Sequence, residues 1–131
     1  MFNEQTLQFE CSGTTLSGIY SPGDASTAIL ILVGGPQYRV GSHRQFVKLS
    51  RTLAKAGISS LRLDFSGMGD SEGELQPFYA NQQTIKQAID TLTEQNPVIR
   101  QVVIWGLCDA ASAALLYHYQ QPDNRVAGLV L

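Results

Sequence analysis

The sequence predicts an α/β fold, a doubly wound and mostly parallel sheet with helices on both faces. Strand-like runs alternate with helix-like stretches along the 131 residues, and this alternation is typical of parallel sheets. The run Thr27–Val33 is apolar, as expected of a strand that is covered on both faces. A leading hairpin then adds an antiparallel part to the sheet.

The first elements follow from turn and capping residues. Residues 7–10 and 16–20, separated by Ser12-Gly13-Thr14, predict an antiparallel hairpin. After the apolar strand, Ser42 as cap and Gln45 at the third helical position form a capping box. The helix that follows is expected to end at Gly57, and residues 58–65 form the next strand.

The second half of the chain repeats the alternation. Residues 81–95 carry apolar residues at the i, i+3, i+4, i+7 spacing of a helix, which stops at Asn96-Pro97. A strand at 101–105, a helix at 109–119 and a strand at 126–131 complete the prediction. We expect one domain, without internal repeats or linkers.

Composition excludes several classes of protein. The net charge of −2 provides no positive field for nucleic acid, and the longest purely apolar run, residues 28–33, is far too short to span a membrane. The first residues lack the basic and apolar regions of a secretory signal, which favours a cytoplasmic protein. Two cysteines make neither a disulfide framework nor a metal cluster, and we expect no cofactor.

Three short segments follow the carboxyl ends of predicted strands, where ligands bind in open α/β sheets. The first contains Gly34 and Gly35, which let the backbone turn sharply and aim N–H groups at an oxyanion. Because Pro36 has no N–H, Gly35 is the natural donor. A plain strand-ending turn is the alternative.

The second segment, residues 64–71, has two glycines flanked by Asp and Ser. It satisfies neither glycine-rich fingerprint for phosphate, because it lacks G-x-G-x-x-G and a P-loop lysine. We expect a structural loop held by hydrogen bonds between side chains and backbone.

The third segment places Cys108 between an apolar strand and an alanine-rich helix. Gly106 and Ala110 supply the small residues that the tight bend of a nucleophile elbow requires. A helix N-terminus favours the thiolate, whereas the neighbouring Asp109 opposes it, and the sequence does not decide between them. The alternative is that Cys108 is a small buried apolar residue.

Together the three segments resemble the α/β-hydrolase superfamily. Residues 64–71 look like its D-x-R-G-x-G-x-S stretch. Residues 33–36 look like its His-Gly-Gly-Pro segment, with Val33 in place of His. Residues 106–110 look like its G-x-S-x-G elbow, with Cys in place of Ser and Ala in place of the last Gly. More narrowly, residues 34–46, 67–73 and 106–112 resemble the exosortase A system-associated hydrolases (hydrolase 1 type), bacterial proteins found with exopolysaccharide and protein-sorting loci.

The resemblance implies an acyl hydrolase or transferase acting on a small-molecule ester or thioester. Cys108 is then the catalytic nucleophile, and the backbone N–H groups of Gly35 and Asp109 form the oxyanion hole. In this superfamily the acid and the base follow the nucleophile in the chain. The catalytic acid and the His base are therefore expected on later strands, outside residues 1–131. The alternative is a non-catalytic fragment, or a split half that needs a partner chain.

Neither of the two histidines is in the place expected for the catalytic base. His118 is ten residues past Cys108, which puts it about 15 Å along the same helix, on its surface or at its end. His43 precedes the nucleophile and, with Arg39 and Arg44, forms either a binding site for an anionic substrate group or a solvated loop. Cys11 is most simply a packing residue.

The resemblance also implies that residues 1–131 are the N-terminal portion of one α/β-hydrolase domain, truncated after about the sixth strand. A single domain of this class commonly runs to roughly 200–250 residues. The last predicted strand then leaves an apolar edge that invites pairing with another copy or with a partner chain. An excised fragment, a partial gene product and half of a split protein all fit this expectation.

Overall fold

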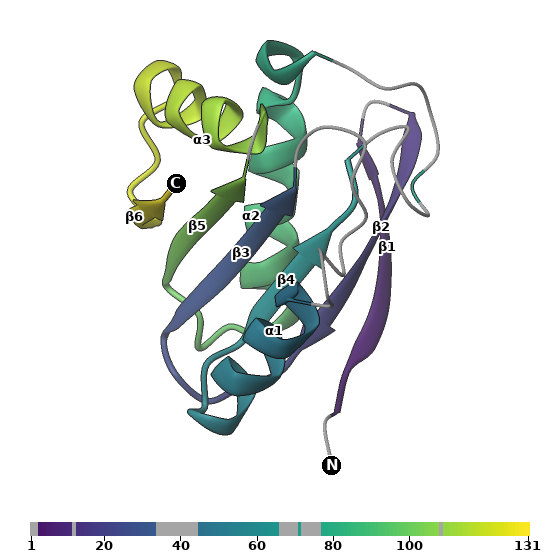
Figure 1. Ribbon diagram of the computed structural model, residues 1–131, viewed down its shortest axis with the longest axis vertical. Helices are drawn as coiled ribbons and strands as arrows, with labels where there is room; N and C mark the ends of the chain where they lie inside the picture. The colour runs from purple at the N-terminus through teal and green to yellow at the C-terminus, as the bar shows by residue number, and fades with distance from the viewer. Residues whose placement is uncertain (1–2, 12, 34–44, 66–70, 72–76, 108) are drawn as a thin grey trace.

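The computed structural model describes residues 3–11, 13–33, 45–65, 71, 77–107 and 109–131 (Figure 1). Its six strands are β1 (Gln5–Cys11), β2 (Thr14–Ser21), β3 (Thr27–Val33), β4 (Ser60–Leu63), β5 (Gln101–Leu107) and β6 (Val126–Val130). The helices are α1 (Gln45–Lys55), α2 (Gln82–Gln95) and α3 (Asp109–Gln120), with a short 3₁₀ helix, η2 (Phe78–Ala80).

All six strands form one sheet in the order β1-β2-β4-β3-β5-β6. The β1–β2 hairpin is antiparallel, and β2 joins β4 in antiparallel register. From there the sheet is parallel, because β3 pairs with both β4 and β5, and β5 pairs with β6. This mixed, mostly parallel sheet confirms the predicted fold class.

Helices cover both faces of the sheet, and each face has its own core. In Figure 1, α1 lies in front of the sheet and α2 behind it. The larger core lies on the α2 and α3 side, where side chains such as Leu30, Leu61 and Ile104 are fully buried. On the α1 side, Ile31 and Phe46 form a smaller core. The strand β3 contributes to both cores, which explains its nearly continuous apolar sequence.

Element boundaries differ most from the prediction at β4, which is shorter at both ends, and at β5, while β1 and β2 each begin two residues earlier and end one residue later than predicted. β4 begins only at Ser60 because the amide of Ile58 still bonds to the carbonyl of Leu53, closing the end of α1. Gly57 stands at this helix end with φ of 80°, as its predicted role requires. β5 extends two residues further than predicted, since Leu107 still pairs with β3. The 3₁₀ helix η2 was not predicted.

A charged cluster fixes β6 against the helices behind the sheet. Arg125, just before β6, donates to Asp123 through its backbone amide and two guanidinium nitrogens, and to Asp90 of α2 at 2.7 Å. Asp123 also accepts a hydrogen bond of 2.8 Å from the hydroxyl of Tyr117 in α3. We call Tyr117, Asp123, Arg125 and Asp90 the β6 clamp, because it ties α2, α3 and the start of β6 together.

Stability is expected to fall in acid through Asp123. Its hydrogen bond from Arg125 lowers the pKa of this carboxyl from 3.8 to about 2. The pKa is lower in the folded state than in the unfolded chain, so the stabilisation is complete above about pH 4 and is lost as the pH falls through about 2. The shift corresponds to about 2 kcal/mol at neutral pH.

Chemical denaturation of wild type and Asp123→Asn between about pH 6 and pH 2 tests this. The variant should be less stable by about 2 kcal/mol at the upper end, and the difference should shrink towards zero at the lower end. Asp24→Asn, which changes an exposed carboxylate, is the matched control and should show no such trend. A difference that does not change with pH would contradict the assignment.

Candidate functional site

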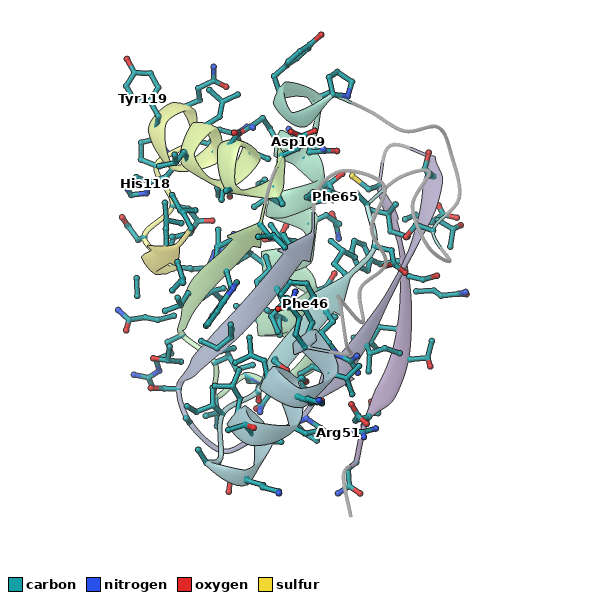
Figure 2. The ribbon with its side chains drawn as sticks, in the orientation of Figure 1. Phe46, Arg51, Phe65, Asp109, His118 and Tyr119 are labelled. Carbon is teal, nitrogen blue, oxygen red and sulfur yellow. The ribbon has the colours of Figure 1, made fainter. Side chains whose placement is uncertain are left out.

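In the sequence, the candidate nucleophile lies between the end of β5 and the start of α3. β5 ends at Leu107 and α3 begins at Asp109, so Cys108 is the single residue between strand and helix. Figure 2 shows Asp109 at the start of α3, above the carboxyl end of β5. Cys108 itself lies outside the described residues. A strand followed by a helix after one residue is the arrangement of a nucleophile elbow.

Gly106 is required by the close approach of α3 to β5. A Cβ atom at this position would lie 3.0 Å from the carbonyl oxygen of Ala110 and 3.0 Å from both N and Cα of Ala111. All three atoms belong to the backbone of α3, so no side-chain rotation can make room. Ala110 is itself fully buried. The close approach of α3 accounts for a glycine at position 106, and a small residue occupies the buried position 110.

The strand that precedes Gly35 in the sequence ends beside the end of β5. β3 is the parallel neighbour of β5, with Val33 opposite Leu107. The chain therefore runs from β3 towards Gly35 beside the point where it leaves β5 towards Cys108. Gly35 lies outside the described residues, as do Arg39, His43 and Arg44, and their predicted roles stay predictions.

The loop after β4 is fixed to the sheet by a serine, as predicted. The hydroxyl of Ser71 donates a hydrogen bond to the carbonyl oxygen of Asp64 and accepts one of 2.9 Å from the amide of Ser17 in β2. The amide of Asp64 in turn donates to the carbonyl of Ser17 at 3.1 Å. Residues 66–70 and 72–76 lie outside the described residues, so the confirmed part is the attachment of the loop at Ser71.

The described residues bring neither a histidine nor a cluster of possible metal ligands to the start of α3. His118 is exposed in the last turn of α3, at the opposite end of that helix from Asp109 (Figure 2). This confirms the predicted place of His118, on the helix surface near its end. The side chain of Asp109 is exposed as well. In the described ranges, no group of three or more His, Cys, Asp or Glu side chains could hold a metal ion.

An open apolar pocket lies next to the elbow on the α1 side of the sheet. Its volume is about 160 Å³, and it is lined by Gln45, Phe46 and Leu49 of α1 and by Trp105 and Leu107 of β5. Leu107 is the residue directly before Cys108, so the pocket adjoins the candidate nucleophile along the chain. A cavity of about 150 Å³ accepts a benzene-sized molecule. The pocket can therefore hold a small apolar group.

This pocket was not predicted from the sequence, in which Trp105 belongs only to an expected strand and Phe46 only to an expected helix. The alternation of Trp105 and Leu107 with the buried Ile104 and Gly106 is the signal that could have placed both on the opposite face of the sheet. Their proximity to α1 depends on tertiary packing, which strand and helix periods do not report.

Solved structures that resemble the chain are α/β-hydrolases and esterases. The esterase Pf2001 of Pyrococcus furiosus superposes with a TM-score of 0.83 at 18% identity, over 97% of this chain and 51% of its own. Est1E of Butyrivibrio proteoclasticus, solved with ferulic acid bound, gives 0.80 at 17% identity over 94% of this chain and 50% of its own. The α/β-hydrolase GrgF of Penicillium sp. sh18 gives 0.75 at 24% identity, over 96% and 44%.

These similarities establish the fold of the chain as that of the α/β-hydrolases. The chain spans about half the length of the solved structures that it matches. No protein-family model and no curated protein matches the sequence. Among the described residues, no helix has the length and apolar character needed to cross a bilayer.

Proposed function

We propose that the chain carries the nucleophile of an acyl hydrolase or acyltransferase that acts on an ester or thioester. The observation that supports this most directly is the contact between Gly106 and the backbone of α3, which requires a sharp strand-to-helix bend at the candidate nucleophile. Cys108 occupies the one position between the two elements. The open pocket beside Leu107 supports a substrate whose acyl part is small and apolar.

In the proposed reaction, the Cys108 thiolate attacks the carbonyl carbon of the substrate. The N-terminus of α3, a helix of 12 residues, favours the thiolate over the thiol. The backbone N–H groups of Gly35 and Asp109 stabilise the negative oxygen of the tetrahedral intermediate. Loss of one such donor typically lowers the rate by about 10²–10³-fold. Collapse of the intermediate breaks the bond to the leaving group, which departs as alkoxide or thiolate and takes a proton from water or from the catalytic acid, and an acyl thioester remains on Cys108.

The proposed enzyme needs an acid and a base that the described residues do not supply. His118 is at the wrong end of α3, and the chain spans about half of the solved structures that it resembles. We therefore propose that residues 1–131 act as the N-terminal portion of one α/β-hydrolase domain, and that the acid and the His base come from polypeptide outside them. The isolated residues 1–131 are then expected to become acylated at Cys108 but not to hydrolyse the acyl-enzyme.

The finer assignments rest on the sequence resemblance. We propose a cytoplasmic hydrolase that serves an exosortase or exopolysaccharide system, without a cofactor. Arg39, His43 and Arg44 are proposed to bind an anionic group of the substrate, such as a phosphate or a sugar acid. The half-length match also supports the alternative function, a non-catalytic half that acts only by binding a partner chain.

Acylation of the protein by an activated ester, read by intact mass, tests the proposal. Incubation with 4-nitrophenyl acetate, and separately with acetyl-CoA, should add one acetyl group that persists because no base completes hydrolysis. The adduct should be lost in Cys108→Ala. The chain offers a matched control in its second cysteine, since Cys11→Ala should keep the adduct in full.

Two outcomes separate the alternatives. A thiol at position 108 that stays unmodified under conditions in which free cysteine is acylated would contradict the catalytic proposal and favour the non-catalytic half. An adduct lost in Cys11→Ala instead would place the reactive thiol elsewhere. Far-UV circular dichroism of both variants excludes unfolding as the cause.

A further inference from the structure

The start of α2 carries two carboxamide side chains that are buried without hydrogen-bond partners. Asn81, the residue before α2, is only 4% exposed, yet its amide makes no capping bond to the helix and no other hydrogen bond to a described residue. Both amide atoms of Gln82, the first residue of α2, are buried, and neither has a partner in the part of the chain that the structure describes. Nearly all buried polar groups in proteins are hydrogen-bonded, and an exception calls for an explanation such as a bound water or ion.

The N-terminus of α2 offers many hydrogen-bond donors. The helix has 14 residues, so its dipole places a partial positive charge at this end, and its first turn contains no acidic residue. The amide of Ile85 is the first to find a helical acceptor, the carbonyl oxygen of Asn81. The backbone N–H groups of residues 82–84 therefore have no acceptor within the helix, and they lie beside the four N–H donors of the Asn81 and Gln82 side chains. A helix end of this kind attracts an anion.

This helix end lies at the edge of the sheet where α/β proteins bind their ligands. α2 connects the parallel strands β4 and β5, so it begins at the edge where their carboxyl ends lie. Figure 1 shows its start beside the start of α3, and α3 packs against both α2 and η2. The positive ends of two helices therefore meet at this edge. Asp109, in the first turn of α3, is exposed, so water screens its negative charge.

The burial of the two amides does not depend on polypeptide outside residues 1–131. The chain itself already covers Asn81 and the amide atoms of Gln82. Thr84 in the same turn is 6% exposed, with its hydroxyl 3.8 Å from the Sγ atom of Cys11, and Ile85 is fully buried in the larger core. Moving the turn outwards to meet another segment would expose these side chains. The partner of the amides is therefore expected to be a ligand of only a few atoms.

We infer that the N-terminus of α2 binds a small carboxylate, held by Asn81, Gln82 and the backbone N–H groups of residues 82–84. A carboxylate has two oxygens that can accept several hydrogen bonds, which matches this cluster of donors. A doubly charged phosphate fits less well, because the first turn contains neither Arg nor Lys, and Lys86 is paired with Asp90 at 3.1 Å. Water or a ligand hydroxyl can donate to the side-chain oxygen of Gln82. For so small a ligand we expect a dissociation constant on the order of 1 mM.

Asn81→Asp, a change that keeps the shape of the side chain, tests whether the site prefers an anion. In a carboxylate site the new side chain supplies the anion itself, so the variant should melt a few degrees above wild type at about pH 7. In a site for water alone, the same change buries an uncompensated charge and should lower the melting temperature. Gln83→Glu is the matched control, because it adds the charge in the same turn on an exposed side chain, and it should change the melting temperature less. A lower melting temperature of Asn81→Asp would overturn the inference.

NMR of the 131-residue protein measures binding directly, through the side-chain NH₂ signals of Asn81 and Gln82 and the backbone amides of residues 82–84. Sodium acetate should move these signals to saturation in the millimolar range, whereas its neutral isostere acetamide and sodium chloride should not. Gln82→Leu should weaken acetate binding at least about tenfold, and Asn81→Asp should abolish it, because its own carboxylate occupies the site. Gln83→Leu, which changes the exposed neighbour, should bind as wild type does.

Three results would contradict a carboxylate site. They are signals that do not move with acetate, signals that respond equally to acetamide or chloride, and acetate binding that both Gln82→Leu and Asn81→Asp retain. Thermal melts of each variant show whether it is folded at the temperature of the titration. The acylation of Cys108 is measured separately, so failure of one proposal leaves the other intact.

Discussion

Replacing Gly23 by alanine is expected to lower the free energy of unfolding by about 3 kcal/mol. A Cβ atom at Gly23 would lie 2.5 Å from the carbonyl oxygen of Gly57, 2.6 Å from its carbonyl carbon and 2.7 Å from that of Ile58. These atoms are backbone, and the oxygen of Gly57 also accepts bonds from the amides of Asp24 and Ala25. The two crossing segments can separate only by breaking those bonds.

The hydrogen bonds of Gly23 itself add to the cost. Its amide donates to the hydroxyl of Ser59 at 2.8 Å, and its carbonyl accepts from the side chain of Asn96 at 3.2 Å. Urea denaturation of Gly23→Ala measures the loss. Gly13→Ala is the matched control: nothing lies within 4 Å of its Cβ, so only its φ of 80° costs energy, about 1 kcal/mol. Equal losses at Gly23 and Gly13 would contradict the crossing argument.

A second large effect is expected at the elbow from Gly106→Val. The Cβ contacts of 3.0 Å to α3 leave no room for alanine without a small shift, and valine adds two methyl groups at the same place. We expect a loss of about 3 kcal/mol in the free energy of unfolding, together with displacement of α3 from the end of β5. Because the proposed reactivity of Cys108 depends on the N-terminus of α3, acetylation by 4-nitrophenyl acetate should slow at least about tenfold.

The neighbouring strand supplies the control for Gly106→Val. Gly128 in β6 has only the Cγ2 atom of Val103 near its Cβ, at 4.0 Å, so Gly128→Ala should change neither stability nor acetylation appreciably. Urea denaturation and the rate of mass increase give the two readouts. A Gly106→Val protein that keeps the wild-type acetylation rate would contradict the proposal that the bend makes Cys108 reactive.

Local signals in the sequence predicted most of the fold. Gly57 marked the end of α1, and its positive φ is the reason that the signal is reliable. Asn96, followed by proline, marked the end of α2, where its amide bonds to the carbonyl of Leu92. The start of β4 was predicted too early because Ile58 has the apolar side chain of a strand residue but donates its amide to α1. Backbone partners of that kind are decided by packing rather than by residue type.

The parts of the candidate site that depend on neighbouring residues in the sequence were predictable. The parts that depend on the packing of distant elements were not. The bend between Gly106 and Asp109 follows from small residues between an apolar run and an alanine-rich stretch. The pocket between Phe46 and Trp105 does not, since it requires α1 to lie beside β5 across β3. The β6 clamp was missed for the same reason: Asp90 and Arg125 are distant in sequence and meet only through the placement of α2.

The position of β3 between β4 and β5 also determines when the chain can fold. β3 and β4 are near in sequence, but the other side of β3 pairs with β5, which is synthesised much later. Until β5 is available, Leu30 and Leu32 belong to a strand with an unpaired edge, and the larger core lacks Ile104. Contacts between segments this far apart slow folding and prolong the exposure of unpaired strands. We therefore expect β3 to remain open to aggregation during synthesis until residue 107 has left the ribosome.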